Sequence, residues 1–253
     1  MNYNSLFLVF TCFIAICIDS IHAVKWIPPT YNNTVVEAFH KKILLNKYEE
    51  VQVDPYSINN YNTTHVGYCG VLYNSSKREF YTLKNFSTVN ELLKNNAFLT
   101  HKGSCGRCST LQDLSVYMKF HNLTAPVRRC GVKGFINKKW NVKCLMNLGL
   151  TLPCAQIWYY NSRNTRKNCL KPCLKDWKEP YNIPNERACP NCTLNSCLAC
   201  DEKISGPIFK KVAARTRRDS CLTSAIWRPL SSIAEITHYY YTKKKLILSQ
   251  KYL

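Results

Sequence analysis

Twelve of the chain's 15 cysteines lie between residues 105 and 221, and this clustering constrains the fold more than any other feature. Disulfides form and persist in oxidising compartments, whereas cytosolic thiols are kept reduced. A density of 12 cysteines in these 117 residues is in the range of small secreted scaffolds. We therefore predict that a disulfide framework stabilises the middle of the chain.

The N-terminus carries a 13-residue apolar run from Leu6 to Ile18, followed by Asp19 and a small residue, Ala23. A bilayer-spanning helix needs about 20 apolar residues, so the run is typical of a signal peptide; an N-terminal anchor is the alternative. We predict that residues 1–23 are removed, that no transmembrane segment remains, and that the protein is secreted or lies in the lumen of the secretory pathway. The loss of Asp19 changes the formal charge from +20 to +21.

Six Asn-x-Ser/Thr sequons are consistent with this compartment, because such acceptors are glycosylated on exposed loops of secreted chains. One of them, Asn191, lies between Cys189 and Cys192, where a disulfide would hinder modification. The predicted glycosylation sites are therefore Asn32, Asn62, Asn74, Asn85 and Asn122.

Twelve cysteines permit six bridges within residues 105–221 and leave Cys69 as the odd thiol, free or linked to a partner molecule. Alternatively, Cys69 pairs into the block and another cysteine is left over. The C-x-x-C pairs between Cys189 and Cys200 are separated by four residues, far fewer than the 15–20 or so of a zinc ribbon, so disulfides are favoured and neither a metal nor a cofactor is predicted. Partners for this cluster include Cys169, Cys173 and Cys221. The predicted disulfide cysteines are Cys105, Cys108, Cys130, Cys144, Cys154, Cys169, Cys173, Cys189, Cys192, Cys197, Cys200 and Cys221.

Hydrophobic periodicity predicts an α+β fold in which helices dominate. Two β-rich runs, residues 66–73 and 78–83, flank a polar turn and predict a hairpin. Apolar residues with helical spacing follow Ser109, and further helices are expected to begin near Pro153, Ile208 and Pro229. The predicted regions are a signal peptide (1–23), a glycosylated N-terminal region with the hairpin (24–104), a cysteine-rich basic core (105–221) and a C-terminal helical tail (222–253).

Two weak resemblances concern the Cys105-Gly106-Arg107-Cys108 run. A C-x-x-C before a helix resembles the redox dithiol of thioredoxin-like proteins, and Cys108 with His238 is similar in order and spacing to the nucleophile and base of papain-like proteases. However, Arg107 departs from the protease pattern, and no Asn follows His238 to orient the base. A structural disulfide is favoured, and no catalytic residue is assigned.

Charge is the more informative feature. No acidic residue occurs between Asp113 and Asp176, while 12 Lys and Arg lie in that span with aromatic residues among them. Arginine forks suit sulfate, phosphate and carboxylate groups, and aromatic faces stack on sugar rings. Lysine-rich composition alone is the alternative explanation. The predicted ligand-binding residues are Arg128, Arg129, Lys138, Lys139, Arg163, Arg166 and Lys167.

The segment Arg215-Thr216-Arg217-Arg218 fits the R-x-[KR]-R pattern of processing proteases of the secretory pathway. The alternative is a basic helix face that continues from Lys210 and Lys211, where positive charge complements the helix dipole.

These observations together predict a secreted, disulfide-stabilised basic glycoprotein that binds a polyanion: an acidic or sulfated glycan, or an anionic membrane surface. Two alternatives stay open. One is a secreted thiol oxidoreductase or cysteine hydrolase that uses Cys108, and the other is an extracellular structural protein linked through Cys69.

Overall fold

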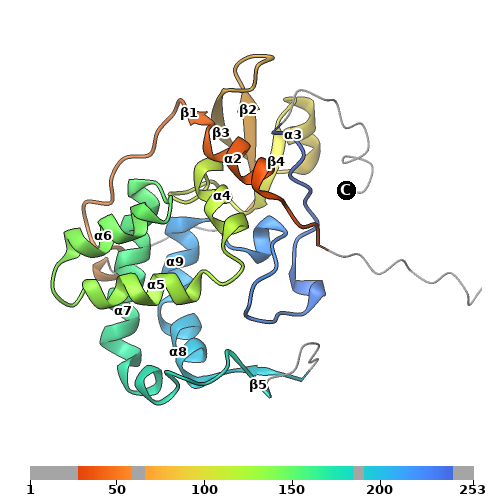
Figure 1. Ribbon diagram of the computed structural model, residues 1–253. Helices are drawn as coiled ribbons and strands as arrows, with labels where there is room; N and C mark the ends of the chain where they lie inside the picture. The colour runs from red at the N-terminus through yellow and green to blue at the C-terminus, as the bar shows by residue number, and fades with distance from the viewer. Residues whose placement is uncertain (1–27, 59–65, 185–190, 242–253) are drawn as a thin grey trace, which may run out of the picture.

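The computed structural model describes residues 28–58, 66–184 and 191–241. A four-stranded sheet occupies one end of the molecule, and helices make up most of the remainder (Figure 1). The predicted helix-dominated α+β class is confirmed. In the ranges just given, no helix is long and apolar enough to cross a membrane. The predicted signal peptide, residues 1–23, lies outside the described residues.

The sheet is built around the predicted hairpin, whose two strands pair antiparallel. Alternate side chains face opposite sides: Cys69 and Val71 enter the main core, whereas Tyr68 and Leu72 pack against a second, smaller cluster. This is the two-residue period of a strand that is covered on both faces. The strands, in the order β1-β3-β2-β4 across the sheet, are β1 (Ile43–Leu44), β2 (Tyr68–Tyr73), β3 (Phe80–Phe86) and β4 (Phe98–Lys102).

Helices cover one face of the sheet and extend away from it (Figure 1). α2 packs against α4 beside the sheet, and α7 contacts α5, α6, α8 and α9, so the long helix α7 is the axis of the helical part. The helices are α2 (Asn33–His40), α3 (Val89–Lys94), α4 (Leu111–Lys119), α5 (Thr124–Lys133), α6 (Lys138–Asn147), α7 (Leu152–Lys175), α8 (Ser196–Ile204) and α9 (Gly206–Ala213). Short elements complete the fold: η1 (Pro55–Ser57), β5 (Asn182–Ile183) paired with β6 (Thr193–Leu194), η2 (Arg218–Ser220) and η3 (Leu230–Ser232).

One continuous core joins the N-terminal region to the cysteine-rich block. Fully buried side chains from α2 and the sheet, such as Phe39 and Tyr81, belong to the same cluster as Leu114 of α4 and Ile157 of α7. The Tyr81 hydroxyl accepts a hydrogen bond from the backbone N–H of Leu111 at 2.8 Å, which fixes the start of α4 against the sheet.

The predicted helix near Pro229 is wrong. Residues 230–232 form a single 3-10 turn, and the chain then runs without helix to a turn at residues 240–241. From Ala234 to Tyr240 every second residue is buried, including Ile236 and His238, which is the period of an extended chain rather than of a helix. We refer to residues 216–241 as the C-terminal segment; it runs along the right-hand side of Figure 1.

Five disulfides link described cysteines, and such a disulfide-rich fold is typical of secreted and secretory-pathway proteins. Cys197 and Cys200 of α8 pair with cysteines of α7, which excludes the zinc alternative for these two thiols. Cys192 is also disulfide-bonded. The five bridges are Cys69–Cys105, Cys108–Cys154, Cys130–Cys144, Cys169–Cys200 and Cys173–Cys197.

The odd cysteine is Cys221 rather than Cys69. Cys69 pairs with Cys105, so the predicted link to a partner molecule through Cys69 is wrong. Cys221, predicted to be bridged, is a free thiol that is fully buried against the sheet, and burial raises its pKa to about 11. The sequence left both arrangements open because the count of cysteines does not distinguish them.

Arg215 is the largest fully buried side chain among the described residues, and it connects three parts of the fold. Its guanidinium donates to the backbone carbonyls of Thr100 in β4 (3.1 Å), and of Cys108 (3.0 Å) and Ser109 (2.9 Å) just before α4. It also donates to the hydroxyls of Thr100 (2.7 Å) and Ser220 (2.9 Å). Five hydrogen bonds thus hold the sheet, the start of α4 and the C-terminal segment around one cation.

We expect Arg215→Met to lower the free energy of unfolding by about 3–5 kcal/mol, because it removes the donors and leaves buried carbonyls unpaired. Chemical denaturation under oxidising conditions measures the change. The control Arg129→Met removes an exposed arginine and should alter stability by no more than about 0.5 kcal/mol. Equal stability of both variants would contradict the role given to Arg215.

Candidate functional site

A cavity of about 780 Å³ lies between the helices and the C-terminal segment. This volume is within the range of about 300–1,000 Å³ usual for ligand sites. Its walls come from α7, α8 and α9 on one side and from residues 216–233 on the other. The lining residues include Trp158, Asn161, Asp201, Glu202, Phe209, Lys210, Arg217, Arg218, Leu222, Ile226, Trp227, Arg228, Leu230 and Ile233.

Aromatic rings form much of the cavity wall. The rings of Trp158 (α7) and Phe209 (α9) pack edge to face, with 4.7 Å between centroids. Trp227 lines the opposite side, and Asn182 fixes its backbone: the Trp227 N–H donates to the Asn182 side chain at 2.8 Å, and the Asn182 amide donates back to the Trp227 carbonyl at 3.3 Å. The wall therefore presents fixed, flat apolar surfaces.

Positive charge exceeds negative charge in the lining, with Lys210 and three arginines against two carboxylates. Arg228 forms an ion pair with Glu202. Burial lowers the pKa of Arg228, Glu202 opposes this shift, and the charge of nearby Arg218 adds to it. A third arginine, Arg217, donates to the backbone carbonyls of Thr223 (2.9 Å) and Phe120, and burial lowers its pKa to about 10.

A polar network surrounds the inner carboxyl group of the cavity. Asp201 accepts hydrogen bonds from the Thr165 hydroxyl and, at 3.4 Å, from the Asn161 amide. Burial raises the pKa of Asp201, and these two hydrogen bonds oppose the shift. The Tyr56 hydroxyl in turn donates to the Asn161 side chain at 2.8 Å, and the Ser205 hydroxyl lies 2.8 Å from that of Thr165. The cavity thus has a hydrogen-bonding inner end and a cationic side.

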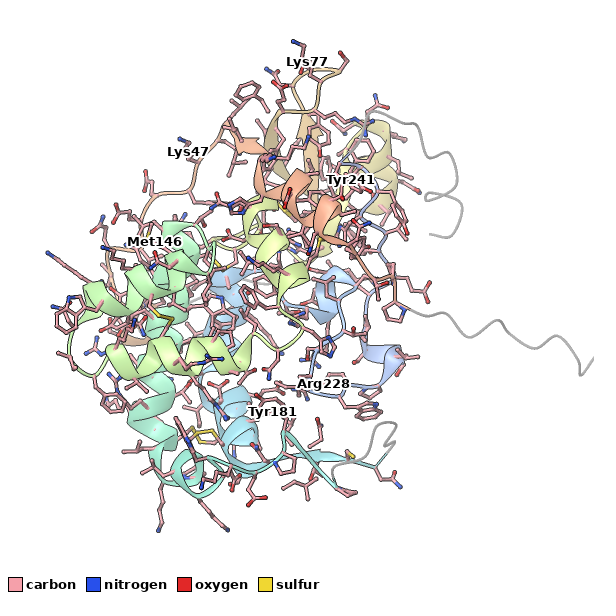
Figure 2. All side chains as sticks on the ribbon, viewed as in Figure 1. Lys47, Lys77, Met146, Tyr181, Arg228 and Tyr241 are labelled. Carbon is pink, nitrogen blue, oxygen red and sulfur yellow. A yellow bond between two sulfur atoms is a disulfide. The ribbon has the colours of Figure 1, made fainter. Side chains whose placement is uncertain are left out.

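Figure 2 shows Arg228 and Tyr181 on the side of the C-terminal segment, while Met146 of α6 lies near the opposite edge of the view. Arg128 of α5 belongs with the first group, because its guanidinium lies over the Tyr181 ring, 5.7 Å from the centroid. Its charge also acts on the Asp201 carboxyl. One of the seven predicted basic residues therefore flanks the cavity.

The other predicted basic residues lie elsewhere on the helical part, and three of them have partners. Lys138 donates to the Tyr160 hydroxyl at 2.7 Å, Arg163 forms an ion pair with Asp54 at 3.2 Å, and Arg166 stacks on Phe135 at 4.2 Å. The remaining three, on α5, α6 and α7, are exposed: Arg129, Lys139 and Lys167.

The candidate catalytic pair is overturned. Cys108 is buried in a disulfide with Cys154, and Cys105 pairs with Cys69, so neither a hydrolase nucleophile nor a redox dithiol exists at this C-x-x-C. His238 is fully buried, and its ring nitrogens contact the Ser220 carbonyl (2.9 Å) and the Tyr240 hydroxyl (3.1 Å). Both groups are structural, as the local departures from the protease pattern indicated.

The predicted processing site at residues 215–218 is not offered by the folded chain. A protease must engage the arginines that precede the cleaved bond, but Arg215 is fully buried and Arg217 is held by carbonyls. The helix alternative is wrong as well, because α9 ends at Ala213. A sequence pattern carries no information about burial, so the motif alone could not show that these arginines are inaccessible to a protease.

The predicted glycosylation sites stay predictions, with differing surroundings. Asn32, Asn74 and Asn85 are exposed, and Asn122 is half-buried, with its side-chain oxygen 3.1 Å from the donating Tyr181 hydroxyl. Asn62 lies outside the described residues.

Residues 138–236 match a family of unknown function (DUF8771). No curated protein and no solved structure matches the chain. The matched range runs from α6 to the C-terminal segment and includes every residue that lines the cavity, so the likeness covers the whole of this candidate site.

Sequence reasoning missed Arg228 and Trp227 because they follow the last cysteine of the block, outside the acid-free span. The available signal was Trp227-Arg228-Pro229, an aromatic–basic run followed by a proline.

Burial lowers the pKa of His238 from 6.5 to about 3, so this imidazole binds a proton more readily in the unfolded chain than in the folded protein. The stability that neutral His238 provides is present above about pH 6.5 and is lost as the pH falls towards 3. Between pH 7 and pH 4.5 we expect the wild type to lose about 2–3 kcal/mol more unfolding free energy than His238→Gln. Denaturation at both pH values measures this difference.

The matched control, His121→Gln, removes an exposed imidazole and is expected to follow the wild-type pH profile. Parallel losses in the wild type and His238→Gln would contradict a buried, neutral His238.

Proposed function

We propose that this protein is secreted and binds an acidic glycan, with the cavity beneath the C-terminal segment as its site. The observation that carries the proposal is the combination, in one cavity of about 780 Å³, of aromatic walls with three arginines that outnumber the carboxylates. Neither feature alone selects a sugar, but together they match both parts of an acidic one: a flat ring and an anionic substituent.

The arginines supply recognition of the anion. Arg228 forms an ion pair with Glu202, and the charge of nearby Arg218 also acts on Arg228, so the lining keeps an excess of positive charge. A guanidinium offers two parallel donors to a carboxylate or sulfate, and the partly enclosed site strengthens this interaction relative to open water. Arg217 adds positive potential, although its donors reach backbone carbonyls.

The aromatic and polar groups supply recognition of the sugar. Trp227 and Trp158 offer rings for stacking, and Asn161 and Asp201 offer amide and carboxyl groups to hydroxyls at the inner end. Burial raises the pKa of Asp201, and the Thr165 and Asn161 hydrogen bonds that oppose this shift also hold its carboxyl group in place. Arg128, over the Tyr181 ring, extends the positive potential towards α5.

A longer polyanion would leave the cavity past Arg128 and reach the helical part of the protein. Three exposed members of the sequence-predicted set, Arg129, Lys139 and Lys167, are proposed as outer contacts for such a chain. They add affinity through summed charge rather than through a shaped site, so their contribution should fall with salt.

The test is binding of a heparin-derived hexasaccharide, measured by calorimetry at physiological salt, to the wild type and to Arg218→Gln/Arg228→Gln. We expect the double variant to bind at least about 100-fold more weakly, because it loses two charge-assisted hydrogen bonds that contribute about 1.5–3 kcal/mol each. Trp227→Ala should weaken binding about 5–10-fold through loss of ring stacking.

The matched control is Lys47→Gln/Lys77→Gln, which removes the same charge from exposed lysines in the upper part of Figure 2. It should leave affinity nearly unchanged, and uncharged maltohexaose should bind none of the proteins measurably. An equal loss in the lysine and arginine variants would mean that charge alone attracts the ligand, and the cavity would not be the site.

A further inference from the structure

The connection between α5 and α6 exposes large apolar side chains that a soluble fold ordinarily buries. Val132, Phe135, Ile136 and Trp140 are 54%, 63%, 75% and 55% exposed, and all lie within nine residues of one another. Single exposed apolar residues are ordinary on protein surfaces. A contiguous group of this kind marks a surface that binds a membrane or another molecule.

Basic side chains surround this apolar group, and acidic ones are missing. The connection lies within the acid-free span between Asp113 and Asp176, so no carboxylate of its own segment neutralises it. The exposed lysines in or beside it are Lys133, Lys138, Lys139 and Lys143.

The apolar group continues onto α7. The Arg166 guanidinium stacks on Phe135 at 4.2 Å, which joins the connection to that helix. Leu170 and Leu174 follow Arg166 at i+4 and i+8, on the same face of α7, and are 45% and 63% exposed. We call residues 132–143 together with Arg166, Leu170 and Leu174 the docking surface.

The backbone of this surface is already hydrogen-bonded. The N–H of Phe135 donates to the Val132 carbonyl at 3.1 Å, and those of Ile136 and Asn137 donate to the Lys133 carbonyl at 3.2 and 3.1 Å. A turn without unpaired N–H groups enters a low-dielectric phase at little cost.

A disulfide fixes the shape of the connection. The Cys130–Cys144 disulfide closes it 14 residues apart, and the Asn141 amide donates to the Cys130 carbonyl at 2.7 Å. The exposed apolar side chains are therefore displayed by a rigid support and do not need ordering when they are covered.

We propose that the docking surface binds an anionic lipid bilayer, with Phe135, Ile136 and Trp140 in the interfacial layer and the lysines against acidic headgroups. Aromatic and aliphatic side chains beside lysines are the composition of segments that lie in a bilayer interface. Charge complementarity selects an anionic surface. An acidic glycan would use the lysines but would leave Ile136 facing water, so a membrane accounts for more of the residues.

This proposal is independent of the cavity. The α5–α6 connection projects at the left edge of Figure 1, whereas the C-terminal segment that lines the cavity runs on the right. A protein molecule bound to a membrane through the α5–α6 connection would therefore keep its cavity available to a glycan ligand.

The experiment is co-sedimentation with vesicles of phosphatidylcholine containing 30% phosphatidylserine, compared with phosphatidylcholine alone. The wild type should partition onto the anionic vesicles. Phe135→Ser/Ile136→Ser should bind at least tenfold more weakly, and Lys139→Gln/Lys143→Gln about 30-fold more weakly, because each lysine near an anionic membrane contributes about a fivefold factor. Brominated lipids should quench a fluorescence component that is absent from Trp140→Phe.

The matched control, Ile43→Ser/Val66→Ser, removes apolar side chains that are 46% and 68% exposed in and beside the sheet, and it should bind as the wild type does. Arg218→Gln/Arg228→Gln should also retain vesicle binding, which separates this proposal from the glycan site. The proposal is overturned if the serine variants of the docking surface bind anionic vesicles normally, or if brominated lipids do not quench Trp140.

Sedimentation velocity without vesicles provides the remaining test: a dimer that Phe135→Ser/Ile136→Ser dissociates would make a second copy the occupant instead.

Discussion

The buried guanidinium of Arg215 is the interaction on which the arrangement of the whole molecule depends. Its five hydrogen bonds reach β4 and the residues before α4, which are more than 100 residues away in the sequence, and the η2 turn nearby. Next to it, the Cys108–Cys154 disulfide fixes the start of α7, and His238 contacts the Ser220 carbonyl. The C-terminal segment, and with it one wall of the cavity, is positioned by this centre.

A chain with few carboxylates satisfies its buried cations in an unusual way. Arg215 donates to three backbone carbonyls, Arg217 to two, and Arg78 donates to the Tyr240 carbonyl at 3.1 Å. Carbonyl dipoles stabilise a guanidinium without cancelling its charge. The structure therefore keeps a large positive field while its arginines are held in place, and the proposed glycan site relies on this combination.

Local pattern predicted the elements whose side chains alternate or repeat regularly. The hairpin of β2 and β3 and the starts of α4, α7 and α9 followed from periodicity and proline placement. The N-cap of α4 is Thr110, whose hydroxyl accepts a hydrogen bond from the Asp113 N–H. The segment after Pro229 was misassigned because a proline that is well placed to start a helix here precedes a single 3-10 turn, and the residues that follow alternate between buried and exposed. Cysteine pairing and the cavity could not be predicted, since both depend on which distant segments meet.

The spacing of the bridges bears on how the protein matures. Each of the five disulfides between described cysteines spans 46 residues or fewer, so in the secretory pathway, where we propose that the chain matures, each pair can form soon after its second cysteine emerges. Cys221 is free, so no disulfide links the described C-terminal segment to the rest of the protein. Residues 216–241 can thus pack onto a body that already holds these disulfides, and those that line the cavity complete its wall through non-covalent contacts alone.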